Sequence, residues 1–394
     1  MAPDRYSLLA VLTCASILAQ ASAQPTPAPQ PEPAAAQPEP AAAQPAAAQA
    51  APPQPATATQ PAAPPLPPPA AAPAPAPAPE LIAAPFDLHR PEIAQFVNDV
   101  VGHEEGWSRK AVVALISQAQ PQSKILDIMS RPLERVAPWW EYRERFVTEE
   151  RIDKGVQYWL DHRLALERFA AEYQVPPEYL VAIIGVETFY GRTTCRYRVL
   201  DALATLAFDY PPRASYFRGE LEQFLLLSRE NKLDPVTTCG SYAGAMGVPQ
   251  FMPSVYRRYA VDADTNRKRD LWDSPDDILA SVANYLHEWG WTPGAPVLAE
   301  TSLDPDPSFQ IEPHNLELNE TVASLGAHGV KVDLEVPRDT PAVLISAEQR
   351  DGPAYRVGFH NFYVITRYNH SARYAMTVYD LAAAVAARVR GMQP

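Results

Sequence analysis

Positive charge is scarce in this sequence. Lysine and arginine together number 33, against 46 aspartates and glutamates, and the formal net charge is −13 at pH 7. A nucleic-acid partner is therefore not expected, because binding to phosphates requires clusters of basic side chains. The same deficit removes electrostatic attraction to an anionic polymer. Affinity for such a polymer would have to come from the shape of a groove.

Cysteine is scarce as well. Of the three cysteines, Cys14 lies in an apolar N-terminal run, which leaves Cys195 and Cys239 in the rest of the chain. An even number of cysteines in an exported protein favours a disulfide. The sequence therefore predicts a bridge between Cys195 and Cys239, and two inert buried thiols are the alternative.

Long apolar runs are also missing. The mostly apolar segment from Tyr6 to Ala19 is short for a membrane span, and the small residues 21–23 that follow fit a signal-peptidase site. We therefore predict that residues 1–23 are a signal peptide. Two alternatives stay open: a retained anchor that tethers the protein to the membrane, and a lipid attached to Cys14.

Between residues 24 and 85 the sequence has almost no large apolar residues and almost no charge. About half of the chain's 44 prolines lie here, mixed with alanine and glutamine. Such a segment cannot bury a core, so we predict a disordered Pro/Ala-rich linker. Residues 86–394 have an ordinary globular composition and are long enough for one large domain or two fused lobes.

Helical periodicity dominates this second part of the chain. Three glycines within residues 239–247 predict a tight hairpin or loop, and alternating segments at 330–336 and 342–345 predict short strands. The fold should therefore be mainly α with a small β component. The predicted helices cover residues 91–101, 109–118, 124–129, 151–173, 178–190 (stopped by Gly191), 199–208, 213–230, 253–259, 276–289 and 371–388, the last capped by Ser371.

One carboxylate stands out. Glu187 lies in the helix predicted at 178–190, which is apolar nearly all round and should be the buried centre of the domain. Burial and the nearby C-terminal end of the helix both disfavour a negative charge, so we expect a raised pKa for Glu187. Such an acid can protonate a glycosidic oxygen near neutral pH. The alternative is a buried structural glutamate satisfied by an arginine or a hydroxyl.

Six segments carry a resemblance to a known family. In chain order they are Val-Glu-Thr-Phe-Tyr-Gly-Arg at 186–192, Leu-Asp-Ala-Leu-Ala-Thr-Leu at 200–206, Gly-Ser-Tyr-Ala-Gly-Ala-Met-Gly at 240–247, Gln-Phe-Met-Pro-Ser at 250–254, Ser-Val-Ala-Asn-Tyr at 281–285 and Asn-Phe-Tyr-Val-Ile-Thr-Arg-Tyr-Asn-His at 361–370. Together they resemble the membrane-bound lytic murein transglycosylase B family. The resemblance covers most of residues 86–388 and is weakest between 298 and 354.

The resemblance implies a fold and a reaction. The fold would be a lysozyme-like catalytic core with an added helical lobe and a small mixed α/β lobe, within residues 86–394. The enzyme would cleave the β-1,4 bond between N-acetylmuramic acid (MurNAc) and N-acetylglucosamine (GlcNAc) in peptidoglycan strands and leave 1,6-anhydro-MurNAc ends. One carboxylate suffices if the substrate's N-acetyl oxygen attacks the anomeric carbon and Glu187 acts first as acid and then as base. The implied location is the periplasm, in association with the cell wall.

Further site residues are implied by the same resemblance. Ser241 matches a position near the catalytic carboxyl or the substrate N-acetyl group, and Gln250 begins a motif that lines the groove. Aromatic faces and phenol hydroxyls suit sugars, which have apolar faces and polar edges. For each tyrosine, half-buried packing is the alternative. The tyrosines expected around the cleft are Tyr142, Tyr285, Tyr363 and Tyr368.

The segment Asp262–Asp273 begins like an EF-hand calcium loop, with oxygen ligands at positions 1, 3 and 5. Members of the resembled family can carry a calcium loop here. This copy has Arg267 where the loop needs glycine, and it lacks a glutamate at position 12. We therefore predict no metal and no other cofactor, with Arg267, Lys268 and Arg269 supplying the positive charge. Weak calcium binding is the alternative.

Two other functions stay open from the sequence. A hydrolytic muramidase would use water and leave a reducing sugar. A cell-wall-binding scaffold would keep the fold without turnover, although the apolar setting of Glu187 favours an enzyme.

Overall fold

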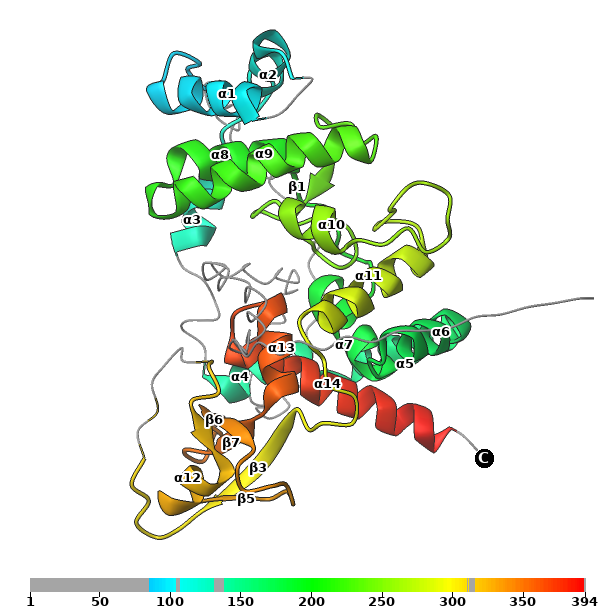
Figure 1. The fold of residues 1–394 in the computed structure, drawn as a ribbon, viewed down its shortest axis with the longest axis vertical. Coiled ribbons are helices and arrows are strands. Elements are labelled where there is room, and N and C mark those ends of the chain that lie inside the picture. The colour runs from blue at the N-terminus through cyan, green and yellow to red at the C-terminus, as the bar shows by residue number, and fades with distance from the viewer. Residues whose placement is uncertain (1–84, 104–106, 131–137, 310, 312–315, 393–394) are drawn as a thin grey trace, which may run out of the picture. The chain divides into compact units, whose positions relative to one another are not determined.

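The computed structural model describes residues 85–103, 107–130, 138–309, 311 and 316–392 (Figure 1). The predicted signal peptide, the Pro/Ala-rich linker and Cys14 lie outside these residues. The described residues all belong to one compact unit. None of the helices among them has both the length and the apolar character that crossing a membrane requires.

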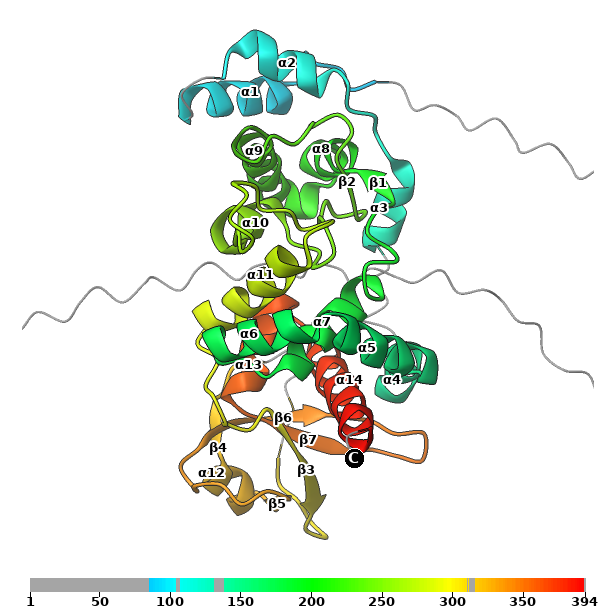
Figure 2. The same cartoon turned by 90° about the vertical axis from the view of Figure 1, so that its right-hand side faces the viewer.

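The fold is mainly α, as the periodicity predicts, with a small antiparallel sheet (Figures 1 and 2). The helices are α1 (Pro91–His103), α2 (Arg109–Ile116), α3 (Ser123–Ser130), α4 (Trp139–Phe146), α5 (Glu149–Asp161), α6 (Arg163–Tyr173), α7 (Pro177–Thr188), α8 (Val199–Asp209), α9 (Ala214–Glu230), α10 (Pro253–Tyr259), α11 (Pro275–Glu288), α12 (Val322–Ala327), α13 (His360–Tyr368) and α14 (Ala372–Gly391), with a 3-10 turn at Pro211–Arg213.

Helix α7 is the buried centre of the fold, as its sequence predicts. Every residue from Leu180 to Thr188 is buried, and Pro177 occupies the first turn, where a missing N–H costs nothing. The helix packs against α5, α6, α11 and α14. It ends at Thr188 and not at Gly191, because Phe189 and Tyr190 already have left-handed backbone angles.

The prediction of a single helix at 151–173 is wrong. The chain breaks at His162 into α5 and α6, with backbone angles of φ −114° and ψ 22° at that residue. No glycine or proline marks the break. The two halves pack on different partners, α5 on α14 and α6 on α11, so tertiary contacts decide their separation.

The small sheet has the strand order β4-β6-β7-β3-β5, and each neighbouring pair is antiparallel. Helix α12 lies beside this sheet (Figure 2), and the two together enclose a second, smaller hydrophobic cluster. Two of its strands, β5 and β6, overlap the segments predicted as strands at 330–336 and 342–345. The other strands and helices α4, α12 and α13 carried no clear signal in the sequence. The strands are β1 (Tyr197–Arg198), β2 (Cys239–Gly240), β3 (Leu298–Leu303), β4 (Glu320–Thr321), β5 (Val330–Val332), β6 (Pro341–Ser346) and β7 (Tyr355–Gly358).

Candidate active site

Glu187 lies in the last turn of α7 and is 8% exposed. The phenol of Tyr374, on the neighbouring helix α14, donates a 2.7 Å hydrogen bond to Oε1 of Glu187. Tyr374 is fully buried, and its pKa is raised well above the ordinary value, first by burial and then by the negative charge of Glu187. The carboxyl of Glu187 is therefore held by a neutral hydroxyl donor.

Tyr374 was missed by the sequence analysis. Ser371 was correctly predicted to cap this helix, and its Oγ accepts the backbone N–H of Tyr374. The cap fixes where α14 begins, but no local pattern indicates that Tyr374 faces a residue 187 positions earlier. Only the packing of α14 on α7 brings the two together.

Tyr368 lies beside the same carboxyl. Its pKa is raised, first by burial and then by the charge of Glu187. Its ring stacks on that of Tyr374, with centroids 6.3 Å apart and planes 12° from parallel. Its hydroxyl donates a 2.6 Å hydrogen bond to the carbonyl of Pro249. Tyr368 therefore links Glu187 to the loop that carries Gln250.

Tyr285 extends this aromatic group. Its ring lies edge-on to that of Tyr368, with centroids 4.9 Å apart, and it also packs against Phe251 and Tyr259. Its hydroxyl donates to the carbonyl of Arg367. Burial raises its pKa, so the phenol stays neutral.

The other two predicted tyrosines differ from each other. Tyr142 is buried on α4, which packs on α14, and it is close enough to Tyr374 to raise the pKa of that phenol in small part. Tyr363, on α13, is half-buried. The guanidinium of Arg367 lies 4.2 Å from its ring centroid, and its ring stacks near that of His360. The structure thus brings Tyr142, Tyr285 and Tyr368 into the surroundings of Glu187 and Tyr374, and it gives Tyr363 a different pair of neighbours.

The glycine-rich segment forms the predicted hairpin-like loop. Gly240 pairs with Met246, and Met246 pairs with Phe251. Ser241 is buried, and its Oγ accepts the backbone N–H groups of Ala243 and Ala245, so the hydroxyl can still donate its own proton.

Gln250 closes the same loop. It has a left-handed φ of 53°, is almost fully buried, and donates from Nε2 to the carbonyl of Gly247 at 2.8 Å. The loop is tied to α7 because Thr188 Oγ1, next to Glu187, donates to the carbonyl of Val248 at 2.9 Å.

A disulfide joins Cys195 and Cys239, whose Cα atoms are 5.1 Å apart. It lies beside the short β1–β2 ladder, in which Arg198 pairs with Cys239 and Tyr197 with Gly240. The bridge therefore connects the chain that leaves α7 to the chain that enters the Ser241 loop.

One group of carboxylates in the described residues could hold a cation. Oxygen atoms of Asp262, Asp264 and Asp277 lie within 4.8 Å of one another. Hard carboxylate oxygens suit Ca²⁺ or Mg²⁺. The third ligand, Asp277, comes from α11, beyond the twelve-residue loop considered in the sequence.

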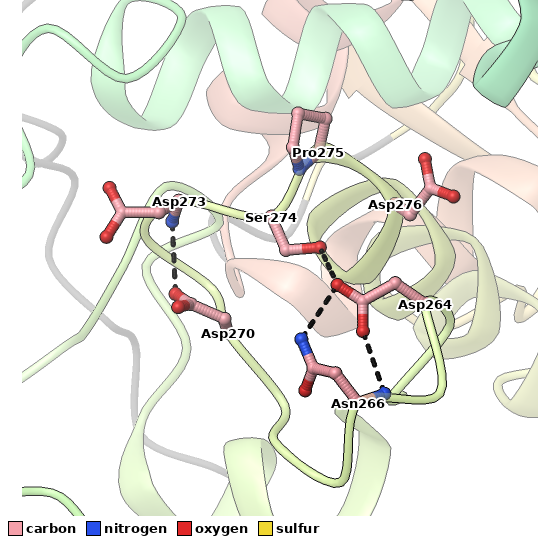
Figure 3. Close-up of a pocket in the computed structure, with 7 residues that line it drawn as sticks. All are labelled: Asp264, Asn266, Asp270, Asp273, Ser274, Pro275 and Asp276. Atoms are coloured by element: carbon pink, nitrogen blue, oxygen red, sulfur yellow. Dashed lines mark hydrogen bonds between the residues drawn. The ribbon is translucent and has the colours of Figure 1, made fainter.

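The loop around these carboxylates also supplies hydrogen bonds to them. Asp264 accepts hydrogen bonds from Asn266 and Ser274 (Figure 3). Asp277 accepts three backbone N–H groups, from residues 263, 264 and 270. Lys268 pairs with Asp270 at 2.5 Å. The three carboxylates are suitable ligands for a cation. The same loop also supplies hydrogen bonds to them and one ammonium group, that of Lys268.

Comparison with known proteins places these features in a family. The family model described as Transglycosylase SLT domain matches residues 89–383. The chain is 41% identical over 306 residues to the membrane-bound lytic murein transglycosylase B of Escherichia coli strain K12, covering 75% of this chain and 83% of that protein.

Comparison with solved structures also finds proteins of similar fold and sequence. The catenated lytic transglycosylase SltB1 from Pseudomonas aeruginosa is 43% identical, with a TM-score of 0.71 over 76% of this chain and 98% of that one. SltB3 from the same organism, solved in complex with NAG-anhNAM-pentapeptide, is 30% identical, with a TM-score of 0.62 over 73% of this chain and 77% of that one. The expected lysozyme-like, mainly α fold class is confirmed.

Proposed function

The chain belongs to the SLT transglycosylase family and is a lytic murein transglycosylase, and from this we propose that it cleaves the MurNAc-β-1,4-GlcNAc bond of peptidoglycan with Glu187 as its single acid/base. The product would be a strand ending in 1,6-anhydro-MurNAc. The observation that carries the proposal is the pairing of Glu187 with Tyr374 amid buried tyrosines.

The first step needs an acid. Protonated Glu187 gives its proton to the glycosidic oxygen, the bond from that oxygen to C1 of MurNAc breaks, and GlcNAc leaves as an alcohol. The N-acetyl carbonyl oxygen of MurNAc attacks C1 from the other face and forms an oxazolinium ion. No second carboxylate is required, because the substrate supplies the nucleophile.

The second step needs a base. Glu187, now a carboxylate, removes the proton from the O6 hydroxyl of MurNAc. O6 then attacks C1, the bond from C1 to the N-acetyl oxygen breaks, and the N-acetyl group is restored. Glu187 ends protonated, as it began, and no water is consumed. A hydroxyl donor such as Tyr374 stabilises the carboxylate between the steps, since a hydrogen bond to the charged form favours it.

The remaining site residues would bind and orient the sugar. We assign Ser241 to the N-acetyl group, because its hydroxyl oxygen is fixed by two backbone N–H groups while its proton remains available. Gln250 and the predicted tyrosines would line the groove. SltB1 is a lytic transglycosylase, and the ligand bound to SltB3 contains an anhydro sugar, which supports the anhydro product over a hydrolysed end.

The deciding experiment is digestion of purified peptidoglycan sacculi by residues 86–394, with mass analysis of the products. Wild-type protein should release muropeptides that lack one water relative to hydrolysed ones. Glu187→Gln should abolish release while sacculus binding and thermal unfolding change little. Glu178→Gln, on the first turn of the same helix, is the matched control and should keep wild-type turnover. Reducing-end products would indicate a muramidase, and unchanged turnover in Glu187→Gln would refute the site.

Export is part of the proposal. We assign residues 1–23 to a signal peptide and residues 24–85 to a linker, so that residues 86–394 act in the periplasm at the cell wall. The Cys195–Cys239 disulfide supports an oxidising compartment. N-terminal sequencing of the protein from a periplasmic extract should begin at Gln24. Recovery of the intact N-terminus in the membrane fraction would instead indicate a retained anchor.

A further inference from the structure

The chain takes an unfavourable path immediately after the proposed catalytic glutamate. Phe189, Tyr190 and Gly191 have φ values of 51°, 60° and 83°, which are three left-handed residues in a row. Glycine adopts this conformation freely, but each of the two aromatic residues is strained there, because its Cβ comes too close to the backbone carbonyl. Such a conformation persists only where surrounding contacts determine it.

The contacts of the Tyr190 side chain hold the backbone in this conformation. Its ring turns back from the end of α7 and enters a slot between α5 and α7. The slot exists because two glycines face it, Gly155 on α5 and Gly185 on α7. A methyl group added at Gly185 would lie 2.5 Å from the phenol oxygen of Tyr190 and 2.6 Å from its Cζ. Both glycines lie inside helices, where glycine is less favourable than alanine.

Helix α14 closes the slot from a third side. A methyl group at Gly155 would lie 2.7 Å from Cγ2 of Val385, as well as meeting the phenol of Tyr190. Helices α5, α7 and α14 therefore converge at the tip of this ring. These include the helix that carries Glu187 and the helix that carries Tyr374.

The tip of the Tyr190 ring fills the slot, with the phenol oxygen and Cζ facing the two glycines. The phenol oxygen of Tyr190 is buried and makes no hydrogen bond to the described residues. The ring packs against that of Tyr158 on α5, with centroids 5.6 Å apart. Phenylalanine would keep the ring contacts, with Tyr158 and with the Cζ side of the slot, and would lose only a buried oxygen that makes no hydrogen bond to the described residues.

We propose that Tyr190 is a positioning residue, whose ring in the Gly155–Gly185 slot sets the spacing of α7 and α14 and so aims the Glu187 carboxyl at Tyr374. This inference rests on the proposed role of Glu187. Tyr190 acts through the helices and does not touch the sugar. A displacement of about 1 Å at a catalytic group can cost on the order of 100-fold in rate, which sets the size of the expected effect.

The test uses residues 86–394 and purified sacculi, with kcat and KM measured separately at a temperature where each variant is folded. Tyr190→Ala should lower kcat about 100-fold and change KM less than about threefold, because the groove residues remain. Tyr190→Phe should restore most of kcat. A loss in Tyr190→Phe as large as that in Tyr190→Ala would overturn the argument from the ring.

A double-mutant cycle separates positioning from general destabilisation. Gly185→Ala alone should lower kcat, because the new methyl group displaces the Tyr190 ring. In the Tyr190→Ala background the slot is empty, so the same change should cost nothing further. Gly219→Ala is the matched control, since a methyl group there meets no atom within 4 Å, and it should stay within about twofold of wild type.

The other possible results of these measurements also support or overturn the proposal. If Tyr190→Ala does not fold, Gly185→Ala and Tyr190→Phe still test the proposal. Additive losses across the cycle would show that the two residues act independently, and the proposal would fail. Glu187→Gln is measured in parallel: if it keeps turnover, the proposed function fails, whereas an inactive Glu187→Gln with an unaffected Tyr190→Ala defeats only the positioning role.

Discussion

The phenol of Tyr374 and the carboxyl of Glu187 are joined by a 2.7 Å hydrogen bond, although 187 residues separate them in the chain. This bond links the last turn of α7 to the first turn of α14. It places a neutral donor on the one carboxylate that the proposed mechanism uses twice.

Removing that donor should slow the enzyme. Tyr374→Phe keeps the ring and its stacking on Tyr368 but deletes the hydrogen bond to Glu187. Hydrogen bonds to charged groups contribute about 1.5–3 kcal/mol, so turnover on sacculi should fall about 10- to 100-fold. Tyr379→Phe, the same change on the same helix, should have little effect. Equal losses in the two variants would argue that any hydroxyl on α14 matters.

The disulfide should stabilise the fold. The bridge between Cys195 and Cys239 closes a loop with a sequence separation of 44 residues, for which chain entropy predicts roughly 4 kcal/mol, with measured bridges commonly giving 2–4. The double variant Cys195→Ala/Cys239→Ala should therefore melt several degrees lower. Dithiothreitol should lower the melting temperature of the wild type towards that of the double variant and leave the double variant unchanged. A wild type that does not respond to reduction would contradict this role.

The buried carboxyl of Glu220 should give a pH-dependent stability. Burial raises its pKa, against the hydrogen bonds from Ser254 and Tyr216, which lower it. The folded state then holds this proton more tightly than the unfolded state. The contribution is complete below the ordinary glutamate pKa and is lost as the pH rises through the raised value.

Glu220→Gln removes that titration. In urea unfolding between about pH 4 and pH 8, the stability of the wild type relative to Glu220→Gln should decline as the pH rises. Glu222→Gln on the same helix is the control and should run parallel to the wild type. If the stability of the wild type relative to Glu220→Gln instead increased with rising pH, the sign would be opposite and the explanation would be rejected.

Chelation should not destabilise the protein. Backbone N–H groups already satisfy Asp262, Asp264 and Asp277, and Lys268 supplies a positive charge beside Asp270. EDTA should therefore leave the melting temperature unchanged, and millimolar calcium should raise it only slightly. A large drop with EDTA that calcium restores, and that Asp264→Asn abolishes, would reveal a resident metal.

The sequence predicted most of the helices because their signals are local. Apolar periodicity gave α8, α9, α10 and α11 to within a residue or two, and Ser371 marked the start of α14. The isolated acid in the apolar run of α7 gave Glu187. These features depend on residues within one or two helical turns of each other, so a linear reading reaches them.

What the sequence alone determined is therefore a mainly α protein with a carboxylate, Glu187, buried in its most apolar helix and a glycine-rich loop to accompany it. The tertiary structure decided the partners of that carboxylate: Tyr374 from α14, Tyr368 from the end of α13, and the slot that holds Tyr190. It also decided the break at His162 and the third carboxylate, Asp277. Each of these depends on which helices pack together, and packing joins residues far apart in the chain through shape and burial, which no local pattern encodes.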